Sequence, residues 1–150
     1  MTTFTPGIDA LLREFHVLSL SVCADGQHWA APLFYVLDPA QPRLLFVTDP
    51  QTRHGQLLRQ AGSAVVTISS ASRSIAEIRG LQMEGAVQRL AGADSEAASA
   101  FYAQTFPVPA HLQPAFWSFQ PHAIKATDNR LHFGAKAYWP APADAAPPLG

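Results

Sequence analysis

Cysteine and charged side chains are both scarce in this 150-residue chain. The single cysteine, Cys23, excludes an intramolecular disulfide and any zinc site built from several cysteines. Charged residues make up only 14% of the chain, and ten basic side chains against eleven acidic ones give a net charge of -1. A general nucleic-acid binder needs a basic surface, so this balance argues against nucleic acid as a partner.

Long apolar runs and a targeting pattern are also missing. No apolar stretch approaches the roughly 20 residues that cross a bilayer as a helix. The start of the chain lacks a basic region followed by an apolar stretch and a cleavage site, so we expect a cytoplasmic protein without a membrane partner. The hydrophobic content of 48% is enough for the core of one domain of ordinary size.

Metal and nucleophile motifs are absent as well. The six histidines are spread along the chain without an i, i+4 pair or an accompanying carboxylate pattern, so we expect no metal site built from protein ligands. No serine lies in a G-x-S-x-G turn, and Cys23 lies beside an expected hairpin turn. The sequence therefore identifies no catalytic residue.

The patterns that are present predict a mainly β domain. Alternating apolar residues predict strands over residues 16–22, 28–38, 43–49, 64–70, 75–90 and 115–126, with a short partner strand at 130–134. Helices are expected after Pro6, over residues 53–60 behind a Thr52 cap, and from an Asp94 cap through Tyr102. Strands and helices do not alternate regularly, so we predict a small antiparallel barrel with peripheral helices.

We expect a single domain over residues 1–139. The remaining residues, 140–150, are rich in proline and alanine and contain almost nothing that could pack into a core. They are predicted to form a flexible tail.

The segment FVTDPQTRHGQLL, residues 46–58, carries the strongest indication of a binding site. An expected strand ending at Thr48 runs through a turn into a helix start that carries Thr52, Arg53 and His54. The first amides of a helix are unpaired, and hydroxyls and a guanidinium beside them can bind a phosphate. The alternative is that Thr52 only caps the helix and Arg53 is solvated.

Gln82 is a second candidate. It lies in an expected strand between Gly80 and Gly85, which are the expected bend or bulge points of that strand. The missing Cβ atoms of these glycines would let a planar ligand approach the backbone. The alternative is an exposed polar residue on an outward strand face. The three tryptophans have the more common explanation of core or interface packing.

Several blocks of sequence, in a characteristic order, resemble a known family. The blocks are HVLSLSV, WAAPLFYVLD, the TRH at residues 52–54 after FVTD, IRGLQMEG, the FPV at residues 106–108, and KATDNRLHFGAK before Trp139. On these blocks the chain resembles the pyridoxamine 5'-phosphate oxidase-like family of FMN-binding split barrels, and within it the subfamily of short bacterial YhbP-type proteins. The resemblance implies a six-stranded antiparallel Greek-key barrel, usually a homodimer, with FMN in a groove formed by both subunits.

The resemblance also implies which residues contact FMN. The helix start after residue 48 is similar to the family's phosphate-binding segment, although many relatives have a lysine and then an asparagine there. A strand glutamine touches the flavin ring in the oxidases, another strand lines the ring, and the partner subunit presents a tryptophan and an arginine. The implied cofactor-binding residues are Ala31, Pro32, Leu33, Phe34, Thr48, Thr52, Arg53, His54, Gln82, Lys136 and Trp139.

Three functions stay open at this point. The first is a flavin-dependent oxidoreductase of unknown substrate, in which FMN carries the hydride. The second is a non-enzymatic barrel that binds or senses a small phosphorylated or planar ligand, which the departures from the family pattern favour. The third is a structural or regulatory homodimer without a ligand.

Overall fold

The computed structural model describes residues 3–109, 111–112 and 114–141. The strands are β1 (Val17–Ala24), β2 (Gln27–Leu37), β3 (Leu44–Thr48), β4 (Ser63–Ser69), β5 (Arg79–Arg89), β6 (Ala115–Asp128) and β7 (Lys136–Trp139). The helices are α1 (Pro6–Glu14), α2 (Arg53–Leu58) and α3 (Gly92–Thr105), with a short 3-10 turn η1 (Ile75–Glu77). Among the described residues, no helix is long and apolar enough to cross a membrane.

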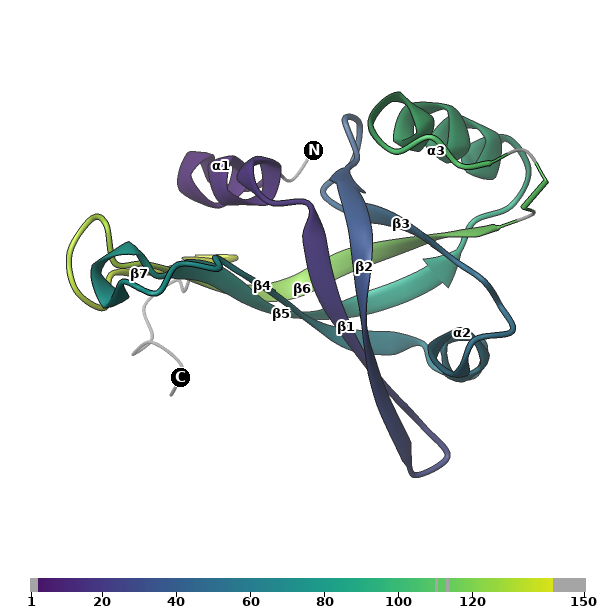
Figure 1. Ribbon diagram of the computed structural model, residues 1–150, viewed down its shortest axis with the longest axis horizontal. Helices are drawn as coiled ribbons and strands as arrows, with labels where there is room; N and C mark the ends of the chain where they lie inside the picture. The colour runs from purple at the N-terminus through teal and green to yellow at the C-terminus, as the bar shows by residue number, and fades with distance from the viewer. Residues whose placement is uncertain (1–2, 110, 113, 142–150) are drawn as a thin grey trace.

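The strands form one antiparallel sheet that closes on itself. Their order is β3-β2-β1-β4-β5-β6-β7, and β3 also pairs with β6 (Figure 1). This extra pairing joins the two ends of a six-stranded sheet, so the predicted six-stranded antiparallel barrel with peripheral helices is confirmed. Helix α2 lies at one end of the barrel beside β1 and β2, and α1 and α3 lie outside the strands (Figure 1).

Closure depends on β6, which is the longest strand at 14 residues. One of its edges pairs with β5, while the other pairs first with β3 over residues 115–119 and then with β7 over residues 124–127. The register between β5 and β6 shifts at Glu84/Gly85, where a Cβ on Gly85 would lie only 2.2 Å from the carbonyl oxygen of Gln120. Gly85 therefore marks the bulge that the sequence indicated.

The barrel interior is filled by alternate residues of each strand. Leu18, Leu20 and Val22 of β1 are at most 1% exposed, and the residues between them face outward. Helix α1 covers part of this core with Ile8, while a second, smaller cluster lies between α3 and the outer side of the barrel around Phe116. The alternating apolar residues that predicted the strands are thus the residues that point into the core.

The start of α3 differs from the prediction. The helix begins at Gly92 with Ala91 as its N-cap residue, so the predicted Asp94 cap is wrong. The Asp94 carboxylate instead accepts a hydrogen bond of 2.8 Å from the buried Arg43 guanidinium. A charge-assisted bond to a buried arginine replaces the cap.

Two strand predictions also need correction. The predicted strand over residues 75–90 begins only at Arg79, because residues 75–77 form η1. The predicted partner strand at 130–134 is wrong, because Asn129 holds that segment in a turn by accepting a hydrogen bond from Gly134 N and donating one to the Ile75 carbonyl. β7 is the partner of β6 instead. Residues 142–150 of the predicted tail lie outside the described residues, so the proposed domain boundary stays a prediction.

Candidate functional site

Helix α2 begins after a tight turn that follows β3. Thr52 is its N-cap residue, as predicted: its Oγ1 accepts a hydrogen bond of 3.1 Å from Gly55 N and donates one of 2.7 Å to the Asp49 carbonyl. Gly55 packs directly against this turn, because a Cβ there would lie 2.5 Å from the Asp49 carbonyl oxygen and 2.9 Å from Thr52 Oγ1. The helix start is therefore locked to the end of β3.

Thr48 and His54 contact each other beneath this helix start. Thr48 is 6% exposed, and its Oγ1 lies 2.5 Å from His54 Nε2. The same nitrogen lies 3.3 Å from Thr52 Oγ1. Burial lowers the pKa of His54 below its ordinary value of 6.5, so the imidazole is neutral at pH 7. The two hydroxyls and the imidazole thus bond to one another and carry no positive charge.

Arg53 points in another direction. Its guanidinium carbon lies 4.2 Å from the centroid of the Trp29 ring. Trp29 belongs to β2 near the hairpin turn and is 45% exposed. The guanidinium has no hydrogen-bond or ion-pair partner within the part of the chain that the structure describes, so its N–H donors remain available.

The four β2 residues predicted to line a flavin ring fall on both faces of the strand. Leu33 packs against the barrel core, and Ala31 shares its face and is partly buried. Pro32 and Phe34 face outward. The Phe34 ring is 51% exposed and lies nearly parallel to the Phe106 ring, with centroids 4.7 Å apart. Only Pro32 and Phe34 therefore present side chains to a ligand on the outer face.

Gln82 is exposed on the same outer face, but several strands away. The register places it opposite Thr67 of β4 and Lys125 of β6, and Thr67 lies opposite Ser19 of β1. Ser19 in turn lies opposite Pro32, which is three strands from Gln82, or about 14 Å at the usual strand spacing. Gln82 and the α2 start are therefore not brought together within one subunit.

Lys136 and Trp139, the predicted contacts from a partner subunit, have different environments. Trp139 is 9% exposed, and its Nε1 donates a hydrogen bond of 3.0 Å to the Thr3 carbonyl. Its ring also packs edge-on against Phe4. Lys136 is exposed at the start of β7. Of the two, only Lys136 is available to a second copy of the chain.

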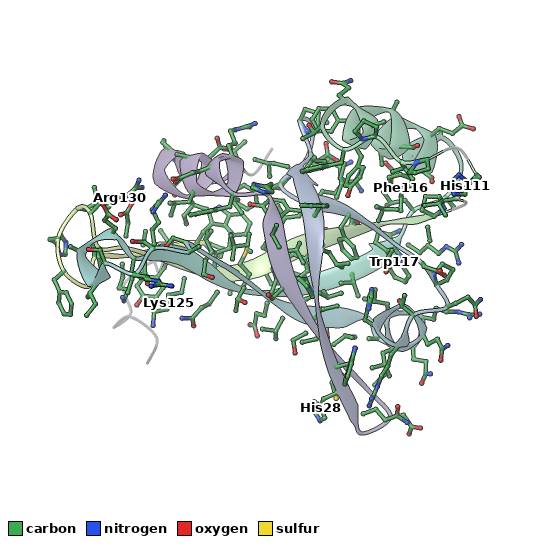
Figure 2. The ribbon with its side chains drawn as sticks, in the orientation of Figure 1. His28, His111, Phe116, Trp117, Lys125 and Arg130 are labelled. Atoms are coloured by element: carbon green, nitrogen blue, oxygen red, sulfur yellow. The ribbon has the colours of Figure 1, made fainter. Side chains whose placement is uncertain are left out.

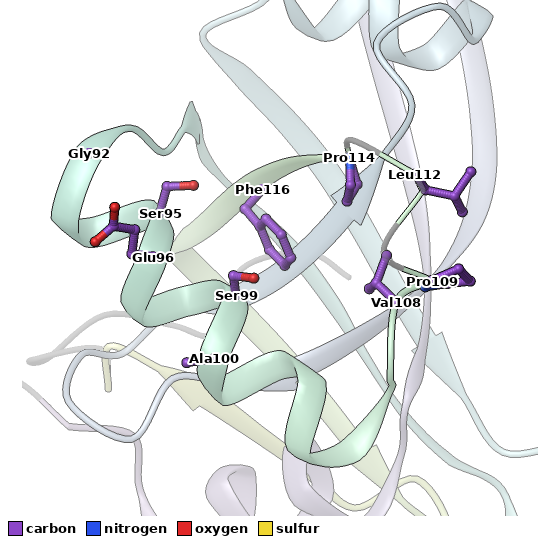
Figure 3. Close-up of a pocket in the computed structure, with 10 residues that line it drawn as sticks. All are labelled: Gly92, Ser95, Glu96, Ser99, Ala100, Val108, Pro109, Leu112, Pro114 and Phe116. Carbon is purple, nitrogen blue, oxygen red and sulfur yellow. The ribbon is translucent and has the colours of Figure 1, made fainter.

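The structure also shows concave regions that the sequence did not indicate. One of about 690 Å³ lies between α3 and the loop that follows it, with Ser95, Glu96 and Ser99 on the helix side and Val108 and Leu112 opposite (Figure 3). Neither its helix face nor its loop has a motif that marks a pocket.

The second concave region, of about 420 Å³, lies on the outer sheet face and is lined by Cys23, His28, Glu84 and His122 among others. His28 lies toward the β1–β2 hairpin turn (Figure 2). Within the described ranges no three His, Cys, Asp or Glu side chains are grouped to hold a metal ion. This region therefore offers no metal site within one subunit.

Comparison with known proteins places the chain in a family. No family model matches it. It is 37% identical over 139 residues to the UPF0306 protein YhbP of Salmonella paratyphi A, and the alignment covers 93% of this chain and 94% of that relative. The chain belongs to the UPF0306 family of YhbP proteins. The subfamily resemblance expected from the sequence blocks is thereby confirmed.

Solved structures of other proteins share the fold of this UPF0306 member. HutZ, the heme storage protein of Vibrio cholerae, superposes with a TM-score of 0.66 at 15% identity, over 80% of this chain and 91% of HutZ. A putative pyridoxamine 5'-phosphate oxidase from Listeria innocua gives 0.65 at 14% identity, over 80% and 94% of the two chains. A FAD binding protein from Mycobacterium smegmatis gives 0.64 at 15% identity, over 82% and 94%. These likenesses establish the split-barrel fold.

Proposed function

We propose that this protein binds FMN and acts as a flavin-dependent oxidoreductase, with Arg53 as the charged contact to the phosphate. The observation that carries the proposal is the Arg53 guanidinium, whose N–H donors are unpaired among the described residues; Arg53 is the first residue of α2, directly after the Thr52 cap. The fold is shared with a FAD binding protein and with a putative pyridoxamine 5'-phosphate oxidase, which supports a flavin as the ligand.

The donor set fits a phosphate through its one cationic member. A phosphate monoester carries a charge of about -1.5 to -2 at pH 7, and its oxygens are strong hydrogen-bond acceptors. A guanidinium presents a planar fork of donors that matches two of these oxygens. His54 is neutral, and Thr52 already donates its hydroxyl proton to the Asp49 carbonyl, so Arg53 supplies the charge.

The remaining predicted contacts would orient and shield the ring. The flavin supplies the redox chemistry when bound. Pro32 and Phe34 of β2 offer apolar surface on the outer face, which would exclude water from one side of a planar ring. Gln82 of the partner subunit would donate or accept a hydrogen bond at the ring edge.

The partner in this proposal is a second copy of the chain. The outer sheet face that carries Pro32 and Gln82 also exposes Val17, which is 40% exposed, and Val65, which is 51% exposed. A second copy covering this face would bury these side chains and bring Lys136 or Gln82 of the partner near β2 of the first. A homodimer mass in solution supports this arrangement, and a monomer with bound FMN contradicts it.

The test is a pair of titrations that separate the phosphate from the ring. Fluorescence quenching of FMN and of riboflavin is measured with the wild type, Arg53→Ala and Arg59→Ala. Arg53→Ala should weaken FMN binding about tenfold, the low end of the 1.5–3 kcal/mol range for a hydrogen bond to a charged group, because the site is exposed. Riboflavin binding should stay within about twofold, because it has no phosphate for Arg53 to contact.

Arg59 is the matched control, because it is also an exposed arginine and lies at the other end of α2. Its removal takes the same charge from the same helix and should leave both affinities unchanged. Equal losses for FMN and riboflavin in Arg53→Ala would place the phosphate elsewhere. A wild type that binds neither flavin would refute the proposal.

The second candidate is a binding module without turnover. It is favoured by the neutral Thr48–His54 contact, which leaves the site with Arg53 as its cation where many relatives of the oxidase-like family have a lysine. A yellow protein that NADH or NADPH reduces, and that an acceptor reoxidises, supports the enzyme. Bound FMN without reduction supports the module, and a Soret band on addition of haem would indicate a ligand like that of HutZ.

A further inference from the structure

Trp29 has no assigned role, and its surroundings set it apart from the other two tryptophans. Trp117 and Trp139 are 3% and 9% exposed and belong to the barrel core, whereas Trp29 is 45% exposed. Its indole does not fill the interior, and its ring face contacts the Arg53 guanidinium, whose carbon lies 4.2 Å from the ring centroid. Core packing, the common explanation for a tryptophan, therefore does not account for Trp29.

We propose that Trp29 is a specificity residue of the FMN site: it holds the Arg53 guanidinium in position for a terminal phosphate, so that the site selects phosphorylated over unphosphorylated ligands. The inference rests on the proposed function. It extends that function by naming the side chain that makes the site prefer a phosphate monoester to the same ligand without its phosphate.

The backbone under Trp29 is rigid enough for this role. Trp29 lies opposite Val22 in the long β1–β2 hairpin, whose strands pair continuously from residue 17 to residue 24. Helix α2, which carries Arg53, packs against both strands. The helix start is fixed in turn by Gly55 and the Thr52 cap. Both partners of the contact thus project from anchored backbone.

The contact orders Arg53 without consuming its hydrogen-bond donors. A guanidinium over an aromatic face is attracted by the ring quadrupole, and its N–H groups stay available to an anion. An ion pair would instead occupy those donors, as it does for Arg43 with Asp38 and for Arg79 with Glu14. Arg53 has an aromatic partner where these arginines have carboxylates. This arrangement is suited to an arginine that must bind an incoming anion.

The expected effect of Trp29 is confined to the phosphate. An exposed cation–π contact is worth about 0.5–1 kcal/mol, so its loss should weaken FMN binding by about two- to fivefold. Riboflavin lacks the phosphate and should bind Trp29→Leu as it binds the wild type. Trp29→Phe keeps an aromatic face and should recover part of the FMN affinity, whereas the apolar leucine should recover none.

The experiment is a double-mutant cycle read with two ligands. FMN and riboflavin affinities are measured for the wild type, Trp29→Leu, Arg53→Ala and the double variant, after thermal denaturation shows that each is folded. If Trp29 acts through Arg53, Trp29→Leu should have no further effect on FMN binding once Arg53 is alanine. A tryptophan that merely supports the hairpin would instead lower both affinities, in both backgrounds.

The outcomes separate this inference from the function on which it rests. An FMN loss of the stated size, absent for riboflavin and absent in the Arg53→Ala background, supports it. Equal losses for both ligands, or an unchanged loss without Arg53, overturn it while the flavin site stands. A wild type that binds neither FMN nor riboflavin overturns both.

Discussion

Substituting Gly55 by alanine tests how tightly α2 is locked to the end of β3. In an open helix this change stabilises by up to about 1 kcal/mol, because glycine has the poorer helix propensity. Here we expect the opposite sign. The new Cβ would lie 2.5 Å from the Asp49 carbonyl oxygen and 3.0 Å from Pro50 Cα, and neither is the end of a flexible side chain.

The size of the effect follows from these distances. Ordinary contact begins near 3.4 Å, so the helix start must move by roughly 1 Å, which costs about 1–3 kcal/mol by the usual price of overpacking. The same movement breaks the 3.1 Å bond between Gly55 N and Thr52 Oγ1, a cap worth about 1 kcal/mol. After the propensity gain, the free energy of unfolding should fall by about 1–3 kcal/mol.

Gly7→Ala is the matched control, because Gly7 lies in α1 and a Cβ there meets nothing within 4 Å. Thermal and urea denaturation of both variants measure the difference. Gly55→Ala should lower the melting temperature by about 3–10 °C, and Gly7→Ala should leave it unchanged or raise it slightly. A Gly55→Ala protein as stable as the wild type would show that the turn moves easily, and the conclusion that the α2 start is locked to the end of β3 would then be wrong.

Two further predictions concern buried polar groups. Tyr35→Phe should lower the free energy of unfolding, measured by urea denaturation, by about 1 kcal/mol. The reason is that the buried Tyr35 hydroxyl donates a 2.7 Å hydrogen bond to the Leu12 carbonyl of α1. An unchanged stability would mean that water replaces this bond. Burial lowers the pKa of His54 below 6.5, so the unfolded chain binds a proton that the folded chain resists. The free energy of unfolding should therefore decrease as the pH falls from 6.5 toward the lowered pKa of His54. His54→Gln should remove the His54 contribution to this decrease. Identical pH profiles of stability for the wild type and His54→Gln would contradict the prediction.

Local chemistry made much of the fold predictable. The inward residues of β1 and β4 are apolar and alternate with outward residues, most of them polar, because each strand has one face toward the core and one away from it. Thr52 was identifiable as a cap because a hydroxyl residue directly before a helical segment satisfies its first amides. The bulge at Gly85 was indicated by a glycine inside a strand.

Long-range partners could not be predicted in this way. Asp94 reads as a cap until the fold brings Arg43 within hydrogen-bonding distance of it. At the candidate site, the sequence predicted four phosphate-binding residues within residues 48–54. In the structure Thr48 and His54 contact each other, and Arg53 is the positively charged side chain of the four. The Trp29–Arg53 contact depends on how the β1–β2 hairpin lies across α2, which no local pattern encodes.

The closing pair of the barrel has a kinetic consequence. Phe46 of β3 lies opposite Trp117 of β6, about 70 residues later in the chain. A chain must lose considerable loop entropy before such a distant pair can form, and domains dominated by non-local pairing fold over about milliseconds to seconds. We therefore expect the β3–β6 pairing to form late, after the β1–β2 hairpin. In stopped-flow experiments, substitutions at Phe46 should leave the refolding rate nearly unchanged and should accelerate unfolding.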